Sequence, residues 1–194
     1  MIKIDKKQGP ASLITYAAAG NRYDAHTSFS AIKKEIRDAL CKEQGYICCF
    51  CMRRIEPNEH STQIAHIQNQ AAHQLEDCEY KNFMGSCSTS NTCNAAQKNR
   101  DLKYNPTDKI HPIENFIRYE PDGKIISDDL EFNEQINKWL NLKFHLLEKN
   151  RSAIYRSINE LLKKAKSFDN KKNIAKKRHV SKAQLTHSMS LGMK

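Results

Sequence analysis

The fold of this chain is decided by two stretches of sequence, YICCFCMRRIE at residues 46–56 and NFMGSCSTSNTCNAAQKNR at residues 82–100. Each stretch carries a pair of cysteines, with spacings of two and five residues between the members of a pair. Two thiolate pairs on separate turns can close a tetrahedral Zn²⁺ site, because a short spacing lets one loop present both sulfur atoms. We therefore expect a structural zinc, the alternative being a set of buried free cysteines. The expected ligands are Cys48, Cys51, Cys87 and Cys93.

Cysteine usage also indicates the compartment. All seven cysteines lie between residues 41 and 93, and the odd number argues against a disulfide framework. The N-terminus MIKIDKKQGP has no apolar region of the signal-peptide kind, and no apolar run reaches the roughly 18–20 residues of a membrane span. These features predict a reduced, cytoplasmic location. Cys41, Cys49 and Cys78 are expected to be ordinary residues.

Apolar periodicity predicts the elements around the cysteines. A helix is expected at 29–43, because apolar side chains recur there at helical spacing. Residues 46–56 are typical of a short turn or hairpin with two cysteines at its tip, and 63–67 (QIAHI) alternate like a short strand. Farther along, Pro121–Lys124 (PDGK) marks a hairpin turn. Two amphipathic helices should follow, broken near Asn150. The sequence thus predicts an α+β protein that is mostly helical.

The net charge of +10 is concentrated at one end. Residues 163–194 hold ten of the 32 Lys and Arg residues but one of the 22 acids, so residues 1–162 are near neutral. A basic segment on a neutral body favours contact with phosphate groups that weakens as salt rises. A solvated tail, or a tail that folds on binding a partner, fits this composition equally well.

Polar groups suited to phosphodiester chemistry lie between and beside the cysteine pairs. His66 sits near the end of the predicted strand, Asn82 precedes Cys87, and Asn94 and Lys98 follow Cys93. A histidine can take a proton from water, while one divalent ion held by oxygen or nitrogen ligands neutralises a scissile phosphate. The order of these residues is what a metal-assisted phosphodiesterase requires.

The segments CCFC, IAHIQNQ and NFMGSCSTSNTCNAAQKN resemble the HNH endonucleases in their zinc-stapled ββα-metal form. The similarity is tight over residues 46–100. The opening MIKIDKKQGPASL and the flanking helices are most similar to the PtuB-like HNH proteins of Septu-type antiphage systems, some of which accompany retrons. The resemblance implies a small HNH core flanked by an N-terminal helix and C-terminal amphipathic helices. The chain then divides into 1–45 (N-terminal segment and helix), 46–100 (HNH core), 101–162 (hairpin and helices) and 163–194 (basic tail).

The same resemblance implies roles for single residues. His66 would be the general base, Asn82 would orient it, Asn94 would bind a catalytic Mg²⁺ or Mn²⁺, and Lys98 would contact phosphate. Expected partners are a nucleic acid, DNA or RNA, and a companion PtuA-like ATPase. A retron reverse transcriptase with its nucleic acid product is a further expected partner.

One position departs from the family pattern. HNH proteins usually carry Asp, Glu or His directly before the base histidine, where it binds the catalytic metal, and this chain has Ala65. A methyl group cannot bind Mg²⁺. Three interpretations stand: Ala65 is an introduced inactivating change, the protein is a naturally weakened nuclease, or another oxygen replaces the missing ligand. Glu76, Asp77 and Glu79 are the acids nearest in sequence.

Two classes of function follow. The first is a metal-dependent endonuclease, the effector of an antiphage defence system. The second is a non-catalytic, zinc-organised module that binds nucleic acid or protein, with Ala65 as its natural residue.

Overall fold

The computed structural model describes residues 1–70 and 72–167. Of the basic segment 163–194, the part from residue 168 on lies outside the described residues, so its predicted contact with phosphate stays a prediction. Within the described ranges, no helix combines the length and the apolar composition needed to cross a membrane.

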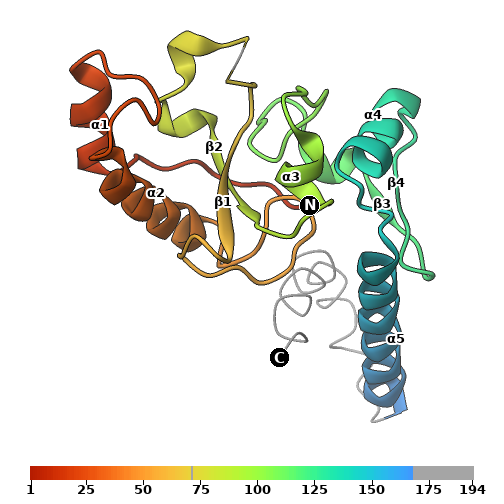
Figure 1. The fold of residues 1–194 in the computed structure, drawn as a ribbon. Helices are drawn as coiled ribbons and strands as arrows, with labels where there is room; N and C mark the ends of the chain where they lie inside the picture. The colour runs from red at the N-terminus through yellow and green to blue at the C-terminus, as the bar shows by residue number, and fades with distance from the viewer. Residues whose placement is uncertain (71, 168–194) are drawn as a thin grey trace.

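An antiparallel pair of strands forms the centre of the fold (Figure 1): β1, Thr62–His66, and β2, Phe83–Cys87. The register sets Ala65 opposite Met84 and His66 opposite Phe83. Because side chains alternate across a strand, His66 and Phe83 face one side of the pair while Ala65 and Met84 face the other. The strand predicted at residues 63–67 is therefore confirmed, shifted by one residue.

The side that carries His66 and Phe83 is covered by two helices, α1 (Ala11–Ala18) and α2 (Phe29–Glu43). The bounds of α2 match the helix predicted from apolar spacing. Helix α1 was not predicted, because its stretch ASLITYAA shows little amphipathic pattern. The buried side chains of this layer are Leu13, Tyr16, Phe29, Ile36, Leu40, Cys78, Tyr80 and Phe83.

The opposite side, which carries Ala65 and Met84, packs against the four predicted cysteine ligands. A five-residue helix, α3 (Cys93–Gln97), closes this layer and lies beside β2 in Figure 1. The turn at residues 46–56 is confirmed: Ile47 and Arg54 form a β-bridge that encloses Cys48 and Cys51. Short 3₁₀ turns η1 (Gln74–Glu76) and η2 (Tyr80–Asn82) connect β1 to β2.

The remaining described elements follow α3 in the chain. They are η3 (Ile113–Asn115), β3 (Arg118–Tyr119), β4 (Ile125–Ile126), α4 (Leu130–Glu134), the π-helical η4 (Gln135–Trp139) and α5 (His145–Ser167). Strands β3 and β4 pair antiparallel, which confirms the predicted hairpin. Among the described residues, helical residues outnumber strand residues, so the α+β class is confirmed, with helices contributing about 40%.

The predicted break near Asn150 is wrong. Helix α5 runs through Asn150, and the chain turns earlier, between η4 and α5. Asn141 adopts φ 50° there, a left-handed conformation that asparagine tolerates better than most residues. Its side-chain Nδ2 donates to the carbonyl of Asn91 at 2.8 Å, so the turn is fixed to the loop that precedes α3.

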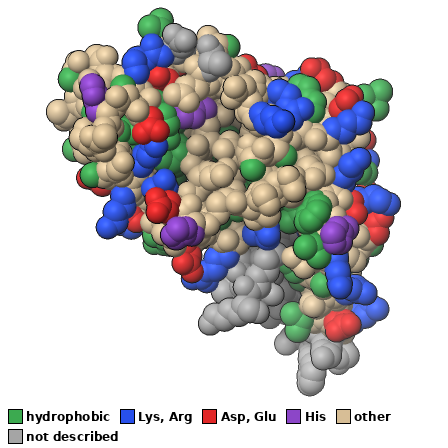
Figure 2. Space-filling model, viewed as in Figure 1, with side chains coloured by type: hydrophobic (Ala, Val, Ile, Leu, Met, Phe, Trp, Pro, Cys, Tyr) green, Lys and Arg blue, Asp and Glu red, His purple; other side chains and the backbone are tan. Residues whose placement is uncertain are grey.

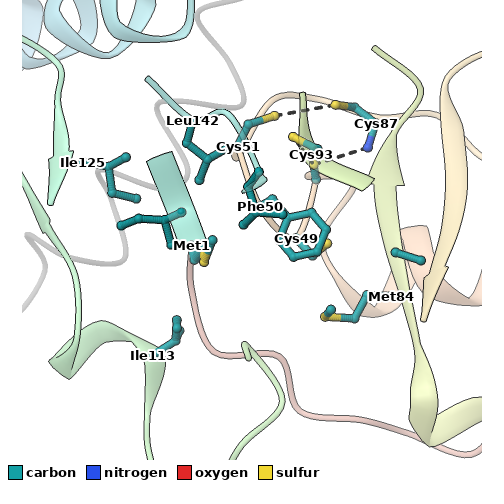
Figure 3. Packing of buried hydrophobic residues seen from close by; sticks show 14 of the residues in the cluster. Met1, Cys49, Phe50, Cys51, Met84, Cys87, Cys93, Ile113, Ile125 and Leu142 are labelled. Atoms are coloured by element: carbon teal, nitrogen blue, oxygen red, sulfur yellow. Dashed lines mark hydrogen bonds between the residues drawn. The ribbon is translucent and has the colours of Figure 1, made fainter. Parts of the chain in front are cut away.

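One hydrophobic cluster joins the cysteine layer to Met1 and Ile4 and to side chains between residues 113 and 147. Met1, Ile113, Ile125 and Leu142 belong to the same buried cluster as Cys51, and Leu142 lies next to Cys51 in Figure 3. In addition, the backbone N–H of Cys93 donates to the carbonyl of Leu140 at 2.8 Å. The segments before and after the cysteine stretches therefore share its core.

Candidate functional site

The four predicted ligands form one buried cluster. The ligand atoms of Cys48, Cys51, Cys87 and Cys93 all lie within 4.8 Å of one another. The Sγ atoms of Cys51 and Cys87 are 3.8 Å apart and those of Cys48 and Cys93 are 3.9 Å apart. In Figure 3 the sulfur atoms of Cys51, Cys87 and Cys93 turn toward one another.

These separations fit a tetrahedral zinc–thiolate centre. Zinc–sulfur bonds of about 2.3 Å in tetrahedral geometry place neighbouring sulfur atoms about 3.8 Å apart, whereas a disulfide requires about 2 Å. All seven cysteines of the chain are unpaired with one another by disulfide. The cluster can therefore hold a metal ion such as zinc, and the prediction that these four cysteines converge is confirmed.

Polar groups around the cluster compensate thiolate charge. The backbone N–H of Cys87 donates to the Sγ of Cys48 at 3.3 Å, and Arg53 Nη2 lies 3.5 Å from the Sγ of Cys87. A buried site with four thiolates and Zn²⁺ carries two negative charges, which nearby donors stabilise. Cys49 is buried but joins no metal-binding group among the described residues.

A second feature is a cavity of about 240 Å³ where β1 meets α3. It brings together three of the predicted site residues, His66, Asn94 and Lys98, but not Asn82. The cavity is lined by Tyr23, Ile64, His66, Asn69, Gln70, Asn94, Lys98 and Asn99. Figure 2 shows Lys and Arg side chains scattered around the edge of a broad surface of uncharged polar groups and backbone, without one continuous basic patch on the visible face.

His66 is held between two aromatic rings. Its ring meets those of Tyr23 and Phe83 edge to face, with centroids 4.8 and 4.9 Å away. The Nε2 atom lies 3.2 Å from the backbone carbonyl of Asp77. A carbonyl can only accept, so Nε2 carries the proton of the neutral ring and Nδ1 keeps its lone pair. Burial lowers the pKa of His66 below its usual 6.5, more than the carbonyl and charge of Asp77 raise it.

Asn82 does not line the cavity. Its Oδ1 accepts from the backbone N–H of Gln68 at 2.8 Å, and its Nδ2 donates to the carbonyls of Gln68 and Glu76. The side chain thus ties both ends of the β1–η1 connection to one point. By these contacts, Asn82 fixes the loop that follows His66.

Asn94 is oriented by a residue that we did not predict. Its Nδ2 donates to Gln63 Oε1 at 3.1 Å, which leaves the Oδ1 of Asn94 to accept from or bind another group. Gln63 and Ala65 are two apart on β1 and therefore share the face that α3 covers. A side chain longer than alanine at position 65 would thus extend toward the side on which Asn94 lies. That alternation is the signal by which Gln63 could have been found.

Lys98 follows α3 in an unusual backbone conformation, with φ 56° and ψ −134°. This region is occupied almost entirely by glycine, and a residue with a Cβ pays about 1–3 kcal/mol to adopt it. The chain carries that strain at the residue whose side chain supplies the positive charge of the cavity. Strain retained at such a position supports a functional role for Lys98.

A pair of variants tests this interpretation of Lys98. Lys98→Gly should unfold at higher denaturant than Lys98→Ala, by about 1 kcal/mol in free energy of unfolding, because glycine alone relieves the strain. Both variants remove the positive charge of the cavity, so both should bind phosphate equally weakly if Lys98 is the phosphate ligand that the resemblance implies. Urea unfolding and phosphate titration measure the two effects. Equal stability of the glycine and alanine variants would contradict the strain at this residue.

The cavity as it stands does not fit a Mg²⁺ site. Mg²⁺ prefers carboxylate oxygens, and among residues 1–70 and 72–167 no carboxylate lines this cavity. The three acids considered as replacements lie elsewhere: Glu76 and Glu79 do not line it, and Asp77 pairs with Arg22 at 2.8 Å. The lining instead offers amides, one imidazole and one ammonium group, a set that suits an anion.

A comparison with protein-family models gives no match for this chain, and a search of curated proteins gives none either. What the chain does is therefore inferred from the geometry of its side chains.

Proposed function

We propose that this chain has the architecture of an HNH endonuclease and acts on phosphodiester bonds of nucleic acid. One observation carries the proposal: His66 with a free Nδ1, Asn94 with its amide oxygen and Lys98 with its ammonium line the same cavity, where β1 meets α3. The cysteine cluster beside it would hold a structural zinc that keeps this small unit folded. A nuclease acting in antiphage defence is the proposed biological setting.

The residues present suggest how hydrolysis would proceed. A scissile phosphate would bind with its oxygens toward Lys98 and the amide groups of the cavity. His66 Nδ1 would take a proton from water as the water oxygen attacks phosphorus. The bond from phosphorus to the 3′-oxygen breaks, and solvent returns a proton to the leaving oxygen. Divalent-ion assistance to this reaction would require a ligand that position 65 does not supply.

The second candidate function is favoured by the same missing ligand. A cavity with a cation and amides but no carboxylate can bind a phosphate without cutting it. The protein would then be a zinc-organised module for nucleic acid or protein. The two functions predict different results when an acid is placed at position 65.

The experiment compares cleavage of DNA and total RNA, with Mn²⁺ or Mg²⁺, by the chain as it stands, by Ala65→Glu and by Ala65→Gln. We expect Ala65→Glu to cut at least about 100-fold faster than the other two, because a carboxylate there supplies a metal ligand and the amide is a poor one. Position 65 is fully buried, so Ala65→Glu should also melt at lower temperature without the ion and recover with it. Binding without cleavage by every version would favour the non-catalytic module.

The proposed partners are those that the resemblance implies: a PtuA-like ATPase, nucleic acid and, in a retron setting, a reverse transcriptase with its product. The described part of the chain offers one feature that supports docking of a protein. Leu161 and Leu162, in the C-terminal half of α5, are 65% and 49% exposed. Figure 1 shows α5 extending from the rest of the fold.

A further inference from the structure

Arg22 lies in the loop between α1 and α2, far in sequence from Asp77, whose backbone carbonyl faces His66. Its Nε donates to Asp77 Oδ2 at 2.8 Å across 55 residues of chain. The Asp77 side chain is 5% exposed, while that of Arg22 is 46% exposed. A carboxylate buried to this degree requires a partner, and Arg22 is the cation that the structure places on it.

The same residue, Asp77, presents its backbone carbonyl to His66 Nε2. Asp77 therefore pairs with the guanidinium of Arg22 through its side chain and with the imidazole of His66 through its backbone carbonyl. Asn82 holds the preceding carbonyl, that of Glu76, at 3.2 Å. Helix α1 fixes the loop that carries Arg22, since the hydroxyl of Tyr16 donates to the Arg22 carbonyl at 3.0 Å.

We propose that Arg22 and Asp77 are positioning residues for His66, in that their ion pair sets the carbonyl which selects the Nε2–H tautomer and directs Nδ1 toward substrate. The catalytic consequence rests on the proposed function, but the tautomer does not. Tyr23, next to Arg22, packs on the same imidazole, so the α1–α2 loop both orients the base and forms part of the cavity. The N-terminal segment is thereby part of the site and not an accessory to it.

The test is long-range ¹H–¹⁵N NMR of histidine-labelled, zinc-loaded protein, which reports the tautomer of His66 directly. The unmodified chain should show Nε2–H. Arg22→Gln should lower the ratio of Nε2–H to Nδ1–H at least about tenfold, because a hydrogen bond of ordinary strength is lost or lengthened. Arg22→Lys keeps the charge without the fixed planar donor and should fall between the two.

The matched control is Arg118→Gln, which removes an arginine from a pair with Asp128 that is exposed on both sides. It should leave the His66 signals unchanged. In the Ala65→Glu background, Arg22→Gln should lower kcat about 10-fold or more with KM nearly constant, since Lys98 still holds the phosphate.

Three results overturn the proposal: an Nδ1–H tautomer in the unmodified chain, an unchanged tautomer in Arg22→Gln, or an equal effect of Arg118→Gln. A tautomer change together with no cleavage by any version would support the positioning role and refute the nuclease. Cleavage by Ala65→Glu with an unchanged tautomer in Arg22→Gln would support the nuclease and refute the positioning role.

Discussion

Replacing Cys93 by serine is expected to abolish cooperative folding of the core and binding of the proposed zinc. The four sulfur atoms sit in the largest hydrophobic cluster, where Met84, Phe50 and Leu142 pack around them. Structural zinc sites bind with apparent free energies of about 10–16 kcal/mol, while whole domains are stable by about 5–15 kcal/mol. Loss of the metal therefore removes more free energy than the fold has to spare.

The matched control is Cys49→Ala, which alters a cysteine that is equally buried and next to Cys48 but outside the cluster. Its expected cost is about 1–3 kcal/mol, the usual effect of a core substitution. Elemental analysis should find one zinc per chain in Cys49→Ala and none in Cys93→Ser, and circular dichroism should show a sharp melting transition for Cys49→Ala alone. A sharp transition in metal-free Cys93→Ser would mean that these four cysteines are not a structural metal site.

Removing His66 from the chain that carries Ala65→Glu is expected to lower the cleavage rate by about 10²–10⁴-fold. A positioned general base contributes a factor of this size. The effect should appear in kcat, with little change in KM, because Lys98 and not His66 carries the phosphate-binding charge. His60→Ala is the control, since its side chain is 90% exposed and lies outside the cavity. Equal rates for His66→Ala and its parent would exclude His66 as the base.

The pKa of His66 also predicts how the cleavage rate changes on the acid side of its pH profile. Burial lowers the pKa of His66 below 6.5, and only the neutral imidazole can accept a proton. The midpoint of the fall in rate on the acid side should therefore lie below pH 6.5. A rate that already falls between pH 8 and 7 would contradict the burial of this base. Initial rates in buffers of constant ionic strength provide the measurement.

Much of the local structure could be predicted because short spacings encode it. Apolar residues at helical intervals predicted α2 at residues 29–43, where it is observed. Apolar alternation predicted β1 one residue away from its observed position. The paired cysteines predicted their own convergence, since each pair lies on one turn and a metal tolerates few other arrangements. The functional roles of His66, Asn94 and Lys98 stay predictions, although the three residues do line one cavity.

Other features depended on contacts that no local pattern contains. The Arg22–Asp77 pair joins residues far apart in the chain, and no periodicity marks either of them. The path of α5 through Asn150 was decided by a turn at Asn141 that is bonded to the loop before α3. In the same way, the contacts of Asn82 with the backbone of Gln68 and Glu76 could not be read from the sequence, and its expected role in orienting His66 stays a prediction.

The two thiolate pairs, the strand that contains His66 and the basic residue after Cys93 could be predicted, because each depends on neighbours within a few positions. Tertiary packing was needed to show which nitrogen of His66 is free, that Gln63 holds Asn94, and that Lys98 is strained. Those properties arise where β1, α3 and the α1–α2 loop meet. The physical reason is that hydrogen bonds and burial in a packed site join groups whose separation in sequence carries no information about their distance in space.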